Sequence, residues 1–168
     1  TSGSADVVLV DMDGKTLNRW EVDAARARLL PNGNILVVHV SPWGEQRKPY
    51  KNFTAIINEY DWEGNVVWSH DAKAVAHHDI HRLPSGNTMF LTSQGIPDEV
   101  IAKITHPERR ALKPYSDTIV EVNLKGEEVW RWDLWKHFDI NYCGMRPCVT
   151  KSSEFKKKMS KHDWTHSN

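Results

Sequence analysis

A phrase that occurs twice in the chain limits the fold more than any other feature of the sequence. The segment Leu30–Val37 reads Leu-Pro-Asn-Gly-Asn-Ile-Leu-Val, and Leu83–Phe90 repeats it as Leu-Pro-Ser-Gly-Asn-Thr-Met-Phe. A second phrase, a turn glycine followed by a tryptophan, recurs as Gly14 with Trp20, Gly64 with Trp68 and Gly126 with Trp130. A period of about 50 residues predicts one supersecondary unit that is repeated along the chain.

Each repeat is predicted to contain two β-hairpins. Thr118–Val122 and Glu128–Trp132 are rich in strand-forming residues, and they flank a turn at Lys125 and Gly126, where glycine can adopt a positive φ. A second hairpin is predicted around the turn at Pro84–Asn87, because proline presets its own φ and glycine closes the turn. Two hairpins make four strands, and a repeated four-stranded unit of about 50 residues is typical of a β-propeller blade.

The predicted fold class is therefore all-β, with blades of four antiparallel strands. The chain holds about three such blades, in repeats of residues 6–53, 54–116 and 117–168 that form a single partial domain. The recurring tryptophans, Trp20, Trp68 and Trp130, are expected to pack between adjacent blades. Propellers typically have about 4 to 8 blades, so three cannot close a ring. A second polypeptide or a missing C-terminal half is expected to complete it, and the full protein could form a homodimer.

Composition and charge argue against two classes of partner. The 22 Lys and Arg residues are balanced by 22 Asp and Glu residues, whereas a surface that binds nucleic acid normally shows a basic excess. No apolar run approaches the roughly 20 residues that a transmembrane helix requires. We therefore expect no nucleic acid partner.

Histidines gather where the predicted blades begin. His77, His78 and His81 lie just before the second Leu-Pro-x-Gly-Asn phrase, and His166 lies close to Asn168. The innermost strand of a blade lines the central channel, so these side chains are expected to converge on an axial site. Imidazoles there can bind an anion, exchange protons near neutral pH or act as nucleophiles. Hydrogen bonding between blade loops is the simpler interpretation, and a metal site is disfavoured because the spacing characteristic of a zinc site is missing.

Three motifs resemble the bacterial arylsulfate sulfotransferases over nearly the whole chain. They are His77-His78-Asp79 before Leu-Pro-Ser-Gly-Asn, Trp130-Arg131-Trp132 followed by His137-Phe138-Asp139, and Asp163-Trp164-Thr165-His166-Ser167-Asn168. The resemblance implies a six-bladed propeller, periplasmic or secreted, that moves a sulfuryl group from an aryl sulfate to a phenol. It also implies a histidine nucleophile that forms a sulfohistidine, and no nucleotide cofactor.

The resemblance also assigns substrate-binding residues by position. His166 and Asn168 match the sulfate-binding histidine and asparagine of the family, and either His77 or His78 supplies another histidine. The nucleophilic histidine and an arginine of the family follow the Asp-Trp-Thr-His element, so they are expected beyond Asn168. The chain alone is therefore expected to be inactive until a further chain or segment completes it. The alternative is a non-catalytic propeller scaffold within a larger assembly.

Two loop segments carry further expectations. Cys143 and Cys148 flank Gly-Met-Arg-Pro, which can bring the two sulfurs together, so we expect a disulfide that would suit an oxidising compartment. The segment from Gly95 to Tyr115 is long and charged. Loops of this length in compact domains are often functional, so this one is a candidate part of the site.

Overall fold

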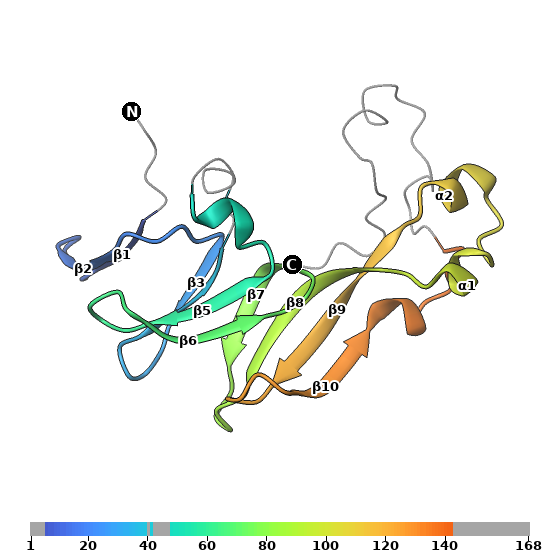
Figure 1. Cartoon of the computed structure of the whole chain (residues 1–168). Coiled ribbons are helices and arrows are strands. Elements are labelled where there is room, and N and C mark those ends of the chain that lie inside the picture. The colour runs from blue at the N-terminus through green and yellow to red at the C-terminus, as the bar shows by residue number, and fades with distance from the viewer. Residues whose placement is uncertain (1–5, 40, 42–47, 143–168) are drawn as a thin grey trace.

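A computed structural model of the chain describes residues 6–39, 41 and 48–142. Over these residues the fold is all-β, with ten strands in antiparallel sheets and a few short helices (Figure 1). The described part contains no helix that is long and apolar enough to cross a membrane. The all-β prediction is therefore confirmed at the level of fold class.

The first sheet region consists of a hairpin followed by a four-stranded antiparallel sheet with strand order β3-β4-β5-β6. Strand β4 is buried along its whole length because it is a continuous run of aliphatic residues at the centre of this sheet. The strands are β1 (Val7–Val10), β2 (Thr16–Trp20), β3 (Arg26–Leu29), β4 (Ile35–Val38), β5 (Ile56–Tyr60) and β6 (Val66–Asp71). A short 3-10 helix, η2 (Tyr50–Asn52), precedes β5.

The second four-stranded sheet has the order β10-β9-β8-β7, again antiparallel throughout. Its two hairpins turn at Gly86 and Gly126, whose φ values of 87° and 80° lie in the left-handed region that glycine adopts without strain. The predicted hairpins around these two turns are therefore confirmed. The strands are β7 (Val75–Arg82), β8 (Thr88–Gly95), β9 (Tyr115–Val122) and β10 (Glu128–Asp133).

The sheets are offset from the repeats that the sequence displays. One sheet spans residues 26–71 and the other spans 75–133, so each sheet takes one hairpin from each of two successive sequence repeats. The hairpin β1-β2 stands apart from both sheets in hydrogen bonding. Strand pairing across the repeat boundary, between β4 and β5 and between β8 and β9, joins the hairpins into sheets.

The two sheets pack against each other through one apolar core. Its buried members come from both sheets and are Leu36, Val38, Ile57, Ala76, Ile80, Phe90, Val120 and Val122. Polar contacts also join the sheets: Arg82 Nη2 lies 2.5 Å from Glu59 Oε2, and its guanidinium lies over the Trp68 ring at 4.7 Å from the centroid. The Trp68 indole N–H donates to the Leu124 carbonyl oxygen at 2.9 Å. The strand faces are therefore held in a single relative position.

The three recurring tryptophans differ in burial. Trp20 is 2% exposed and Trp68 is partly buried against the main core, but Trp130 is 44% exposed. Trp130 lies on β10, an edge strand that no further sheet covers within the described residues. Trp20 and, in part, Trp68 are therefore packed, whereas no partner sheet for Trp130 lies within the described residues, and packing of the three between blades stays a prediction.

Strand register also corrects the alignment of these tryptophans. Trp20 pairs with Val7, whereas Trp68 pairs with Glu59 and Trp130 pairs with Glu121. Relative to the turn, the residue that corresponds to Trp68 in the first hairpin is Asn18. Its amide donates to the Trp62 carbonyl at 2.8 Å, as Trp68 does to Leu124.

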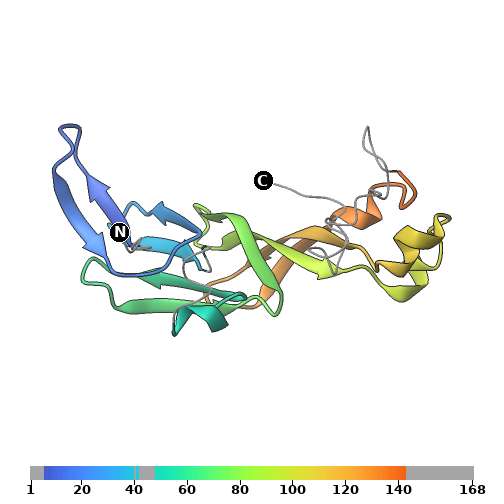
Figure 2. The same ribbon diagram turned by 90° about the horizontal axis from the view of Figure 1, so that it is seen from above.

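A helical segment between β8 and β9 replaces the simple loop that was expected there. It contains α1 (Asp98–Ile101) and α2 (Pro107–Ala111), and it lies at the opposite end of the molecule from β1 and β2 (Figure 2). A small separate core holds it against the chain that follows β10, which includes the 3-10 helix η3 (Leu134–Lys136). The buried residues of this core are Ile96, Ile101, Ile104 and Ile140.

A buried histidine holds the end of β4 in the first sheet. His39 Nδ1 donates to the Asp23 carbonyl oxygen at 2.6 Å, while His39 Nε2 lies 3.1 Å from Asn58 Nδ2 and 3.2 Å from the Tyr60 hydroxyl. The His39 ring also stacks on Tyr50. This arrangement suits the neutral imidazole, and burial lowers the pKa of His39, with the Asp23 contact opposing that shift only in part.

We expect this histidine to make the fold sensitive to acid. The pKa of His39 is lowered in the folded state, so the unfolded chain binds the proton more readily. The contribution of His39 to stability is fully present above the pKa of an unfolded histidine, about 6.5. Below that pH the free energy of unfolding falls by up to about 1.4 kcal/mol per pH unit. Urea unfolding from pH 8 to pH 5 should show a shallower loss of stability in His39→Gln than in the unsubstituted protein.

Burial also lowers the pKa of His70, but His70 is present in both proteins and contributes equally to both. The difference between their pH slopes therefore isolates His39. His81→Gln is the matched control, since it makes the same substitution at an exposed histidine. Equal pH slopes in His39→Gln and His81→Gln would contradict the prediction.

Candidate anion-binding histidine site

A β-bulge in β7 separates two parts of the strand and displaces two residues from the ladder. His77 pairs with Leu91 and Ile80 pairs with the adjacent Phe90, so His78 and Asp79 have no partner of their own on β8. His78 has a φ of 57°, a conformation that costs a non-glycine residue roughly 1–2 kcal/mol. Bulges of this kind often lie beside functional sites, because they redirect side chains away from the sheet.

The buried carboxylate of Asp117 contacts the His77 ring. His77 Nε2 lies 3.0 Å from Ser93 Oγ and 3.2 Å from Asp117 Oδ1, and the Asp117 side chain is only 1% exposed. Ser93 Oγ donates its own hydrogen to Asp117 Oδ1 at 3.0 Å, so it accepts from His77. The hydrogen of His77 is therefore placed on Nε2, and the lone pair of the neutral ring is left on Nδ1.

His78 continues this chain of contacts toward solvent. Its Nδ1 lies 2.8 Å from His77 Nδ1, and the two rings are nearly perpendicular with centroids 5.0 Å apart. Because His77 Nδ1 carries the lone pair, His78 donates its Nδ1–H to His77. The contacts thus run from the buried carboxylate of Asp117 through His77 to the exposed imidazole of His78.

Asp79 belongs to a different set of contacts. Its Oδ1 lies 2.7 Å from Arg28 Nη2 and 3.7 Å from Arg26 Nε, both on β3, an edge strand of the other sheet. Burial opposes ionisation of Asp79, but the two arginines outweigh it and hold the pKa of the carboxyl below its ordinary value. Asp79 therefore points away from the histidine pair, and these residues do not converge as metal ligands.

A hollow of about 600 Å³ opens beside the histidine pair. His77, His78 and Ser93 form part of its lining, and the segment between β8 and β9 forms much of the rest. Small-molecule sites in proteins commonly have volumes of about 300–1,000 Å³. The expectation that the segment Gly95 to Tyr115 borders a site is therefore consistent with its position.

A scan against protein-family models matches residues 2–168 to the arylsulfotransferase (ASST) family. The chain belongs to this family. A search of curated proteins found no match. Family membership confirms the resemblance inferred from the three motifs, and it covers both sheets as well as the histidine pair.

The other residues that the family resemblance singled out are not part of this described site. His166 and Asn168, the two other predicted sulfate-binding residues, lie outside the described residues, as do Cys143 and Cys148. His137 is exposed and stacks on Trp132 at 4.6 Å between ring centroids, away from the hollow lining. Both His77 and His78 line the hollow, so the structure brings together the two alternatives that the motif left open.

Asp117 and Ser93 are site residues of this family member that sequence reasoning missed. Both lie in strands of the second sheet, facing His77 from β9 and β8. The available signal was an acidic residue within the strand-forming run Tyr115–Val122, where a buried carboxylate requires a partner. The identity of that partner depends on strand pairing, which the sequence does not display.

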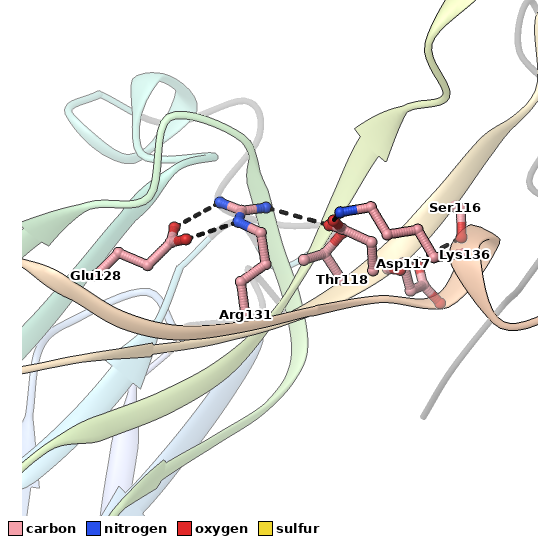
Figure 3. A network of polar contacts seen from close by, with 7 residues as sticks. Ser116, Asp117, Thr118, Glu128, Arg131 and Lys136 are labelled. Carbon is pink, nitrogen blue, oxygen red and sulfur yellow. Dashed lines mark hydrogen bonds and ion pairs between the residues drawn. The ribbon is translucent and has the colours of Figure 1, made fainter. Parts of the chain in front are cut away.

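A second polar network fixes the strand that carries Asp117. Asp133 accepts from Thr118 Oγ1 at 3.1 Å and from Lys136 Nζ at 2.7 Å, and Arg131 bridges Asp133 to Glu128 (Figure 3). Burial raises the energy of the charged Asp133, but Lys136 and Thr118 hold the pKa of this carboxyl below its ordinary value. The cations near β9 are therefore engaged with Asp133 and Glu128, while Asp117 faces His77.

Proposed function

We propose that this protein takes part in sulfuryl transfer from aryl sulfates to phenols, and that His77 and His78 bind the sulfate. The observation that carries the proposal is the contact chain Asp117, His77, His78 beside a hollow of about 600 Å³, in a chain of the arylsulfotransferase family. An imidazole N–H beside that hollow is a suitable partner for a sulfate oxygen. The buried Asp117 orients the His77 ring, and His77 in turn contacts His78.

The proposed reaction has two displacement steps at sulfur. A histidine nitrogen attacks the sulfur, the sulfur–oxygen bond to the aryl group breaks, and the aryloxide leaves with a proton from a nearby acid. The acceptor phenol then gives its proton to the conjugate base of that acid as its oxygen attacks the sulfohistidine, and the sulfur–nitrogen bond breaks to regenerate the histidine. In this scheme His77 and His78 hold the sulfate oxygens, with His166 and Asn168 as further binding residues. We place the nucleophilic histidine and an arginine beyond Asn168, as the family resemblance implies.

The two packed sheets are proposed to be neighbouring blades of a six-bladed propeller, of which the repeats 6–53, 54–116 and 117–168 supply about half. Two observations support this. The sheets pack face to face through one core, and the same type of contact, a side-chain N–H to a turn carbonyl, joins β1-β2 to the first sheet and the first sheet to the second. Trp130 is exposed at the position where the next contact would form. A further segment or a second polypeptide is proposed to complete the ring.

A periplasmic or secreted location and a disulfide between Cys143 and Cys148 complete the proposal. The location follows from the family resemblance, and the disulfide follows from the Gly-Met-Arg-Pro spacer between the cysteines, which would suit an oxidising compartment. Mass measurement after alkylation, with and without a reductant, tests the disulfide directly.

The decisive experiment is a transfer assay on the purified protein with its completing segment or chain. We expect 4-nitrophenyl sulfate and phenol to yield 4-nitrophenolate, detected by absorbance, and phenyl sulfate, detected by mass spectrometry. Rapid quenching without the acceptor should show protein that carries one additional SO₃ group. A completed protein that transfers nothing from a panel of aryl sulfates would overturn the enzymatic proposal and favour the non-catalytic scaffold.

A further inference from the structure

We propose that the hollow beside His77 and His78 binds the aromatic ring of the substrate, and that the segment between β8 and β9 determines which rings fit. This inference rests on the proposed function, and it adds the part of the chain that contacts the aromatic ring and selects its size. The ligand would be an aromatic ring that bears one anionic ester group.

The lining of the hollow has two chemically different sides. His77, His78 and Ser93 supply a polar side that can donate hydrogen bonds to an anion. Ile101, Leu112 and other apolar residues of the segment between β8 and β9 supply the second side. A molecule with an anionic head and an apolar ring matches this division, since the head would contact the imidazoles and the ring would be removed from water.

The rim adds a cation that is free to reorient. Lys113 and Asp98 both line the hollow, and Lys113 Nζ lies 3.4 Å from Asp98 Oδ1 with both side chains largely exposed. Such exposed pairs contribute little to stability, so Lys113 can turn toward an anionic ligand at little cost. The rim can therefore present one cation, Lys113, to an anionic ligand.

The apolar side is built as a rigid unit of its own. Ile101 packs in the separate core with Ile104 and Ile140, and the Arg109 guanidinium donates to the Ile140 carbonyl oxygen. Thr105 donates from both its backbone N–H and its hydroxyl to Asn141 Oδ1, at 2.8 and 3.0 Å. The wall is therefore preorganised, and substitutions that face the hollow can change its shape without disturbing the two sheets.

Leu112 is the residue best placed to test this wall. It lines the hollow, it is only partly buried, and it is not among the buried residues of the small core. A larger side chain at position 112 should reduce the volume available to the substrate ring and leave the histidine pair intact. The effect on a large ring should then exceed the effect on a small ring.

The experiment compares kcat/KM for 4-nitrophenyl sulfate, which has one ring, with that for 4-methylumbelliferyl sulfate, which has two fused rings. We expect Leu112→Trp to lower the ratio of large-ring to small-ring kcat/KM by about tenfold, and Leu112→Ala to raise it. Leu17→Trp is the matched control, because Leu17 is exposed and its strand β2 lies at the opposite end of the molecule from α1 and α2 (Figure 2). Melting temperatures of all three variants identify any that fail to fold, and Leu112→Ala serves if Leu112→Trp does not fold.

The outcomes separate the two proposals. An active protein whose substrate ratio is the same in Leu112→Trp, Leu112→Ala and Leu17→Trp would overturn this inference and leave the proposed function standing. A protein inactive toward every aryl sulfate would overturn the proposed function. Titration calorimetry with 4-methylumbelliferyl sulfate would then test the hollow directly, because binding that Leu112→Trp weakens supports the inference and an absence of binding overturns it. If other parts of the protein fill the hollow, 4-methylumbelliferyl sulfate should not bind and Leu112→Trp should have a lower melting temperature. That result also overturns the inference.

Discussion

Replacing Trp20 with alanine is expected to destabilise the protein by about 3–5 kcal/mol, the range for truncating a large buried aromatic residue. Trp20 is almost completely buried and packs in a core with Val22, Ile35, Val37 and Tyr60. Its indole N–H also donates to the Asp61 carbonyl oxygen at 2.7 Å. The substitution would therefore leave a cavity and remove the partner of a turn carbonyl. Urea unfolding followed by circular dichroism measures the change.

The control is Trp130→Ala, because Trp130 has the same chemistry and lies in the corresponding type of hairpin but is 44% exposed. We expect it to cost no more than about 1 kcal/mol in the chain as described. Trp20→Phe should fall between the two, since it keeps most of the packing and loses the hydrogen bond. Equal losses in Trp20→Ala and Trp130→Ala would show that burial in this structure does not decide the contribution of these residues.

Replacing His78 with alanine is expected to lower the kcat/KM of sulfuryl transfer by about 100-fold, the lower end of the effect of removing one preorganised donor from a charged intermediate. His78 lines the hollow and receives support from the buried Asp117 through His77. Its side chain is exposed, so its removal should leave the melting temperature nearly unchanged. The assay is release of 4-nitrophenolate from 4-nitrophenyl sulfate in the presence of phenol.

His81→Ala is the matched control for this substitution. His81 lies on the same strand, is also exposed and follows the bulge, but it does not line the hollow. Its loss should change kcat/KM by less than about twofold. If both alanine variants retain full activity, the histidine pair has no part in binding the sulfate, and the contacts of His77 with Ser93 and Asp117 are structural.

Much of the local structure was predictable because its causes are local. Gly86 and Gly126 have positive φ values in tight turns, and strand-forming residues flank them, so both hairpins could be placed from the sequence. The histidines of the site were identified by their motif, but Asp117 was not. Asp117 is far from His77 in the sequence, and only the pairing of β8 with both β7 and β9 brings the two side chains together.

The sequence by itself determined the all-β class, the turns that delimit the hairpins and the family, since these depend on residue preferences and motifs within short segments. Tertiary structure decided which hairpins join into a sheet. It also gave Trp20 a different cross-strand position within its hairpin from the one that Trp68 and Trp130 share. It also decided the bulge at His78 and Asp79 and the helical wall of the hollow. The physical reason is that cross-strand register and sheet packing are set by contacts between residues distant in sequence, where burial and hydrogen-bond satisfaction outweigh local preference.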